Sequence, residues 1–156
     1  MCLQTAYAQL LTEKELKKAT KFSWEKAQGT TPEKVLKLKL KEEEVALFLE
    51  KIETYIYLQS LDLNNCNLSE LPKAIFKLTN LQELIISNNP ITVIPSEIGE
   101  LKNLKWLYAT FIKATTLPSS IKELRKLHTL FLWGSEITYF PVEFLELKAT
   151  LKVLNI

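Results

Sequence analysis

The hydrophobic positions of the chain repeat every 23 residues from Leu58 onward. Counted from the first leucine of each repeat, offsets 0, 3, 5, 10, 13, 17 and 20 are apolar in all four repeats. A proline follows the fifth of these positions each time, at Pro72, Pro95, Pro118 and Pro141. Internal periods of about 20 to 50 residues are typical of solenoids, in which each repeat buries its apolar face against its neighbours. The pattern therefore predicts a stack of similar turns around one continuous core.

The repeated pattern LxxLxLxxNxLxxLPxxIxxL resembles the leucine-rich repeat family, in the 23-residue LPxxI type of bacterial and Ras-group intracellular members. The resemblance covers residues 58–156. It implies an α/β fold, a right-handed solenoid. The LxxLxL segment forms a short strand of a parallel sheet on the concave face, and the LPxxIxxL segment returns along the convex side.

The resemblance also implies that the side chain at offset 8 is buried and bonds the neighbouring turns. Asn89 is the family's consensus residue there, and Cys66 is a tolerated variant. Ile112 cannot form hydrogen bonds, and Ala109 and Ala114 reduce the core volume of the same repeat. Unpaired buried polar groups cost about 1–3 kcal/mol each. We therefore expect the third repeat to be the least regular.

The same apolar spacing extends back one period, which predicts a degenerate first repeat over residues 35–57. Its strand is expected at residues 35–40. Residues 42–57 also show helical spacing of apolar positions, which predicts a helix on the convex side.

Residues 12–28 have the pattern of an amphipathic helix. Thr12 and Glu15 form a possible capping box, and Gly29 suits the end of the helix. We expect residues 1–34 to form an N-terminal helical cap that covers the open end of the core, with Trp24 packed inside it.

Residues 151–156, LKVLNI, match the strand of one more repeat, so residues 58–156 hold four full repeats and a partial one. An open strand edge is usually covered in natural proteins. The pattern thus leaves three possibilities for this edge: the natural chain continues, a partner covers it, or a second copy forms a homodimer there.

Composition limits the class of function. The net charge of +2 is too small to indicate nucleic-acid binding, and no apolar run is long enough to span a membrane. The first residues do not resemble a signal peptide, and two cysteines do not make a disulfide framework. A cytoplasmic protein is expected, with signal-independent secretion left open.

Motifs for catalysis are missing from the sequence. It has no Gly-rich phosphate loop, no zinc-ligand spacing and no serine-nucleophile motif, so we expect no enzyme activity, catalytic residue, metal or cofactor. His128 has no carboxylate in register with it, so a surface position without catalytic function is expected.

The variable positions of the strands should face the concave surface, and aromatic residues gather there in two adjacent repeats. The predicted partner-binding residues are Ile85, Trp106, Tyr108, Phe111, Phe131 and Trp133. Exposed apolar patches mark interaction sites, and Trp and Tyr are frequent hot-spot residues. The alternative is that these rings only stabilise the sheet by cross-strand pairing, or pack on another copy.

The leading interpretation is a non-enzymatic module that binds a protein or peptide through this concave patch. Two alternatives stay open at this point. The chain is a self-associating structural protein, or it is the recognition part of a larger signalling or effector enzyme.

Overall fold

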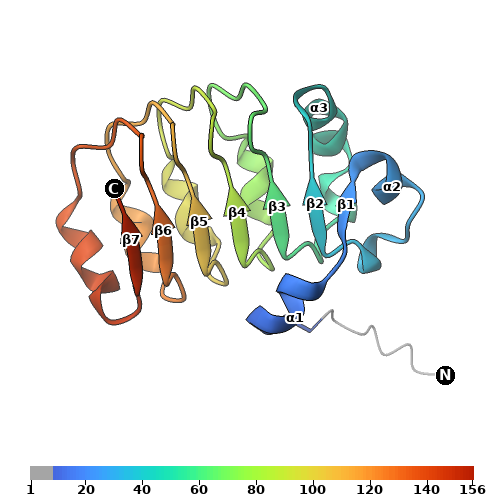
Figure 1. The fold of residues 1–156 in the computed structure, drawn as a ribbon, viewed down its shortest axis with the longest axis horizontal. Helices are drawn as coiled ribbons and strands as arrows, with labels where there is room; N and C mark the ends of the chain where they lie inside the picture. The colour runs from blue at the N-terminus through green and yellow to red at the C-terminus, as the bar shows by residue number, and fades with distance from the viewer. Residues whose placement is uncertain (1–8) are drawn as a thin grey trace.

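The computed structural model describes residues 9–156, which form a solenoid with one parallel sheet (Figure 1). The sheet has seven strands in sequence order, all parallel. The strands are β1 (Lys21–Ser23), β2 (Lys37–Lys39), β3 (Ser60–Asp62), β4 (Glu83–Ile85), β5 (Trp106–Tyr108), β6 (Thr129–Phe131) and β7 (Val153–Asn155).

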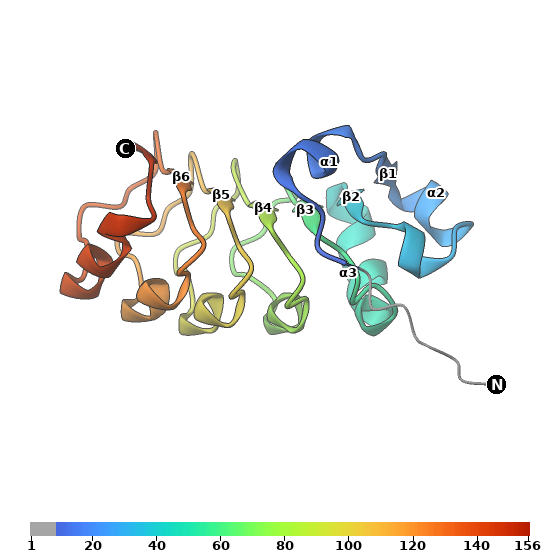
Figure 2. The same cartoon turned by 90° about the horizontal axis from the view of Figure 1, so that it is seen from below.

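The opposite, convex side carries helices that return the chain to the next strand (Figure 2). The first is the α-helix α3 (Glu42–Glu50), which a short 3-10 helix (Ile52–Thr54) follows. Later repeats use 3-10 helices alone, at Lys73–Lys77, Ser96–Glu100, Ser119–Glu123 and Val142–Ala149. Each of these four helices begins directly after one of the prolines that recur every 23 residues, and the fixed φ of proline suits that position.

The register of the sheet follows the sequence period. Ser60 pairs with Glu83, and Glu83 pairs with Trp106, so partners are 23 residues apart. The central leucine of each strand thus falls into one buried column: Leu38, Leu61, Leu84, Leu107 and Leu130. The seven apolar positions of the degenerate first repeat, residues 35–57, are buried as well.

Asn89 holds two repeats together from within the core. Its Oδ1 accepts hydrogen bonds from the backbone N–H groups of Cys66 and Leu68, each at 3.0 Å. Its Nδ2 donates at 2.8–3.1 Å to the carbonyl oxygens of Leu63, Ile86 and Ser87. One buried side chain therefore satisfies five backbone groups of adjacent turns.

The third repeat is more regular than the sequence suggested. Its strand β5 keeps unbroken register with both neighbours, and Ile112 is simply buried in the core. The irregular feature lies in the turn after β5, where Phe111 has a φ of +54°. The equivalent residues in the other repeats, Asn65, Asn88 and Gly134, also have positive φ, but Asn and Gly tolerate that conformation well.

The predicted single helix over residues 12–28 is wrong. This segment instead forms α1 (Glu13–Lys18), β1 and α2 (Trp24–Gln28), and a 3-10 turn (Pro32–Lys34) follows. Residues 21–23 add a parallel strand to the edge of β2, which would otherwise leave its N–H and C=O groups unpaired. Hydrogen bonding to that edge outweighs the helical spacing.

Other features predicted for this segment are present. Thr12 and Glu15 form the capping box of α1, and Gly29 ends α2. Trp24 is buried and packs on the rings of Phe48 and Tyr55, with centroids 5.9 and 5.8 Å away. The first eight residues of the predicted cap, including Cys2, lie outside the described residues.

The position of α1 was not expected. Figure 2 shows it on the strand side of the solenoid, over the concave face, whereas the cap was expected to cover the end of the core. At the other end, β7 forms as predicted and leaves Val153, Leu154 and Ile156 exposed. No helix within residues 9–156 is long and apolar enough to cross a membrane.

Candidate functional site

Two aromatic rings stack on the concave face. Tyr108 at the end of β5 and Phe131 at the end of β6 are paired residues in the sheet, with ring centroids 5.2 Å apart and planes at 7°. Ile85 precedes them in the same column of β4. All three side chains are half-buried and point to the same face, as the 23-residue period predicts.

A second aromatic pair lies in the turns that follow these strands. Phe111 and Trp133 meet edge to face, with centroids 4.8 Å apart, and the N–H of Phe111 donates to the carbonyl of Trp133. They are 48% and 56% exposed. We call Ile85, Tyr108, Phe111, Phe131 and Trp133 the aromatic patch.

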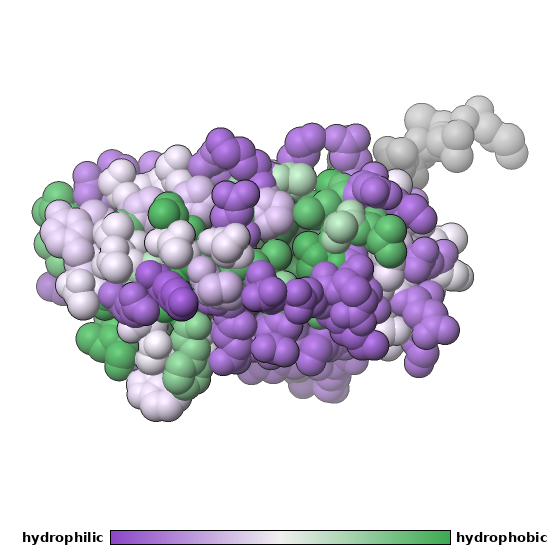
Figure 3. Space-filling view, turned by 90° about the horizontal axis from the view of Figure 1, so that it is seen from above, coloured by the Kyte–Doolittle hydropathy of each residue, from purple (hydrophilic) through white to green (hydrophobic). Residues whose placement is uncertain are grey.

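The aromatic patch occupies the C-terminal half of the sheet. At the N-terminal half, lysines dominate the strands β1 and β2, with Lys21, Lys37 and Lys39. Figure 3 looks onto the edge where the strands end and shows hydrophilic residues along the lower centre and right, below a hydrophobic group, and a mixture of weakly polar and hydrophobic residues toward the left. The concave face is therefore divided into a charged and an aromatic half.

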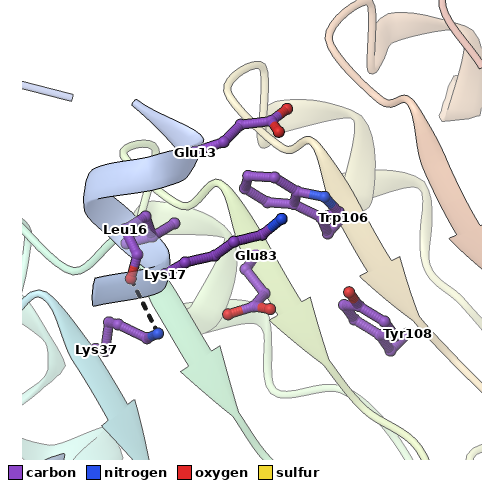
Figure 4. A pocket seen from close by; sticks show the side chains of 7 residues that line it. All are labelled: Glu13, Leu16, Lys17, Lys37, Glu83, Trp106 and Tyr108. Atoms are coloured by element: carbon purple, nitrogen blue, oxygen red, sulfur yellow. Dashed lines mark hydrogen bonds between the residues drawn. The ribbon is translucent and has the colours of Figure 1, made fainter. Parts of the chain in front are cut away.

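Trp106 does not belong to the accessible surface, which corrects the prediction for this residue. It is only 8% exposed, because α1 lies over it (Figure 4). Its ring meets His128 edge to face at 5.1 Å. Between α1 and the sheet remains a small cavity of ≈ 50 Å³, with Glu13, Leu16, Lys17, Lys37, Glu83, Trp106 and Tyr108 as its lining.

The chain before and within α1 is held by polar groups that the sequence analysis did not single out. The side chains of Gln59 and Gln82, both fully buried, bond the N–H and the carbonyl of Leu11 at 2.8 and 2.9 Å. Lys37 donates to the carbonyl of Leu16 at 3.0 Å. In the sequence, the sign of this contact is the glutamine at offset 1 of two adjacent repeats.

His128 has a carboxylate partner after all. Its Nε2 lies 2.7 Å from Oε1 of Glu13, and its Nδ1 lies 3.0 Å from the hydroxyl of Thr129. Glu13 comes from α1, far away in sequence, so no register argument within the repeats could find it. The half-buried position of His128 under α1 differs from the free surface position that was expected.

Electrostatics on this face favour neutral or paired groups. Burial, with a further contribution from the negative charge of Glu83, raises the pKa of Tyr108, so its hydroxyl stays protonated and can donate a hydrogen bond. The buried Asp62 pairs with Lys21 at 2.8 Å.

The thiol of Cys66 is buried in the core. Burial raises the pKa of the Cys66 thiol to about 11, which makes it a poor nucleophile. Within residues 9–156, no three His, Cys, Asp or Glu side chains gather in a way that would hold a metal ion.

Comparisons with known proteins agree with this geometry. The family model for the leucine-rich repeat region matches residues 33–156. A leucine-rich repeat protein of Leptospira interrogans is similar, with 28% identity and a TM-score of 0.56 over 79% of this chain and 37% of that one. Internalin InlF of Listeria monocytogenes has 22% identity and a TM-score of 0.64, over 80% and 35% of the two chains.

Internalin C2 of Listeria monocytogenes gives 21% identity and a TM-score of 0.61, over 80% of this chain and 53% of that one. At such identities the internalins show a shared fold. No curated protein matches the chain. The chain spans about a third to a half of the length of these solved structures. The 23-residue LPxxI subtype stays a prediction, but the model match over most of the sequence settles the family. The chain belongs to the leucine-rich repeat family.

Proposed function

We propose that this protein is a non-enzymatic interaction module, and that it binds a segment of another protein on the aromatic patch. Leucine-rich repeat domains generally bind proteins, which supports the class of function. The location on the patch is our own inference from the side chains.

The observation that carries the proposal is the packing of the two aromatic pairs. Tyr108 on Phe131 and Phe111 on Trp133 form neighbouring units from adjacent repeats, and the second pair is about half exposed. Rings that already pack on each other lose little conformational freedom when a partner docks, so they make good hot spots.

The partner should present apolar side chains with at least one hydrogen-bond acceptor. The protonated hydroxyl of Tyr108 is available to donate to a carbonyl or carboxylate of the partner. Lys39 of β2, which makes no ion pair within residues 9–156, favours an acidic residue at the end of the partner that lies over the N-terminal half.

The test is affinity capture with the wild-type chain, followed by calorimetric titration of the captured partner against variants. Phe131→Ala and Trp133→Ala should each weaken binding by about 30-fold or more, which corresponds to a hot spot of about 2 kcal/mol. Tyr139→Ala removes an exposed aromatic side chain outside the patch and should leave the Kd unchanged. Wild-type Kd values for both patch variants would rule out this site.

Self-association is the second candidate. The observation that favours it is the exposure of the apolar side chains of Val153 and Leu154 in β7 and of Ile156 after it. Unpaired strand edges with apolar side chains are templates for pairing with another chain. Light scattering over a range of concentrations tests self-association: a strict monomer at the highest concentration excludes it.

A further inference from the structure

Residues 9–18, which we call the strap, cross the concave face. The strap contacts Lys37 of β2 (Figure 4) and, farther along the sheet, His128, the residue before β6. It lies beside the aromatic patch and hides Trp106, which the repeat pattern otherwise places on the same surface. This segment of the chain thus covers the part of the concave face that lies beside the aromatic patch.

The sheet holds the strap largely by its backbone. The side-chain amide of Gln59 accepts from the N–H of Leu11 and donates to the carbonyl of Gln9, while Gln82 donates to the carbonyl of Leu11. Gln82 also donates to Gln59 at 2.7 Å, so the two amides form a fixed pair. Backbone groups are common to all peptides, so this amide pair can bind any extended segment that reaches it.

The strap itself is weakly anchored. Its helix α1 has six residues, too short to be stable alone, and Leu16 is its one buried side chain within the described residues. Its other hydrogen bonds are polar contacts: residues 9–11 bond the buried amides of Gln59 and Gln82, Lys37 bonds the carbonyl of Leu16, and Glu13 bonds His128. Segments with few buried apolar contacts open locally without unfolding the rest of the protein.

We propose that the strap is an intramolecular ligand of the concave face, and that it must leave before a partner can bind across both the aromatic patch and Trp106. The competing segment would share its chemistry: an extended stretch held by Gln59 and Gln82, followed by a short helix with one apolar side chain in the place of Leu16. This step rests on the proposed function, but the opening of the strap can be measured without any partner.

Acrylamide quenching of tryptophan fluorescence in the full chain tests the opening. Trp133→Phe removes the exposed tryptophan, so only the buried Trp24 and Trp106 emit. In this background Leu16→Ser removes the buried anchor of the strap and should make about half of the emission quenchable. Leu47→Ser is the matched control, because Leu47 is a helical leucine that is 50% exposed, and it should change nothing.

Hydrogen exchange of the same variants separates opening from unfolding. In Leu16→Ser, the amides of Leu11 and Ala19 should exchange at least tenfold faster, while those of Leu107 and Leu130 keep wild-type protection. The proposal is overturned if strap amides and Trp106 become accessible only together with the strands. It is also overturned if Leu16→Ser leaves Trp106 protected.

A synthetic peptide of residues 9–18 then serves as the probe for binding in trans. Added at millimolar concentration to the Leu16→Ser variant, it should restore protection of Trp106, whereas a peptide with Leu16 replaced by Ser should not. Absence of protection would show that the strap is not a ligand of this face. Because no outside partner takes part, this result stands apart from whether the aromatic patch binds one.

Discussion

The ring of Phe111 lies on Gly134 so closely that a Cβ atom on the glycine would come within 2.5 Å of its Cε1. The two residues are equivalent positions of adjacent repeats, and both have positive φ, +54° and +69°. A left-handed conformation costs a bulky residue about 1–2 kcal/mol. Strain of this kind persists where the surrounding structure enforces it, often at functional sites. The aromatic patch therefore includes a strained residue, Phe111, and the neighbouring Gly134 makes room for its ring.

We expect Gly134→Ala to lower the free energy of unfolding by about 1–2 kcal/mol or more, since the new side chain meets both an unfavourable φ and the Phe111 ring. Urea denaturation measures the change. Gly29→Ala is the matched control. Its φ is −89° and its Cβ would meet only the carbonyl of Lys26 at 3.8 Å, so a neutral or slightly stabilising effect is expected.

The two contributions at Gly134 can be separated by a double-mutant cycle with Phe111→Asn. Asn tolerates positive φ and removes the ring, so Gly134→Ala should cost less in this background, by roughly 1 kcal/mol. Additive effects would mean that the ring moves aside freely and that only the backbone conformation matters.

The solenoid and its register could be predicted because they depend on local repetition. Leu61, Leu84 and Leu107 hold the same position in successive repeats, so they lie in one buried column of the stack. The pairing of the residues on either side of them follows from the 23-residue period alone. The stacked column of Tyr108 and Phe131 is a direct consequence. The aromatic character of this half of the surface was therefore predictable.

The burial of Trp106 could not be predicted by the same argument. It depends on the strap, whose contacts with Gln82 and His128 join residues more than 70 positions apart and have no period. Likewise, β1 forms because an open strand edge was within reach, which no pattern within residues 12–28 indicates. Such contacts depend on the assembled fold, while the repeat pattern describes only its parts.

Asn89 should be a major determinant of stability. Asn89→Ala removes the hydrogen-bond partner of four backbone groups of adjacent turns, while the carbonyl of Ser87 keeps the N–H of Asn65, and we expect a loss of about 3–5 kcal/mol. Asn103→Ala is the control, because this side chain makes one surface bond to the carbonyl of Thr79 and one to Lys126. It should cost less than about 1 kcal/mol. Equal losses in urea denaturation would contradict the role assigned to Asn89.

The tryptophans at the two ends should behave differently. Trp24→Ala empties a site between Phe48 and Tyr55 and is expected to cost about 3–5 kcal/mol, whereas Trp133→Ala should cost about 1 kcal/mol or less. Trp24→Phe is the informative control. The indole N–H of Trp24 has no hydrogen-bond partner within residues 9–156, so a phenyl ring should retain most of the stability. If Trp133→Ala proves the more damaging, the exposed pair is structural.

Cys66 should be protected from thiol reagents while the protein is folded. In a Cys2→Ser variant it is the only thiol, and burial raises its pKa to about 11, so at pH 8 it is both covered and protonated. We expect Ellman's reagent to react with the folded chain at least 100-fold more slowly than with the chain unfolded in urea.

The unfolded thiol has a pKa of about 8.5 and therefore loses its proton first as the pH rises. The contribution of Cys66 to stability is thus complete below pH 8.5 and is lost toward pH 11. In the Cys2→Ser, Cys66→Ala variant, other groups still titrate but this loss of stability should disappear. Rapid labelling of the folded Cys2→Ser chain at pH 8 would contradict the buried position of Cys66.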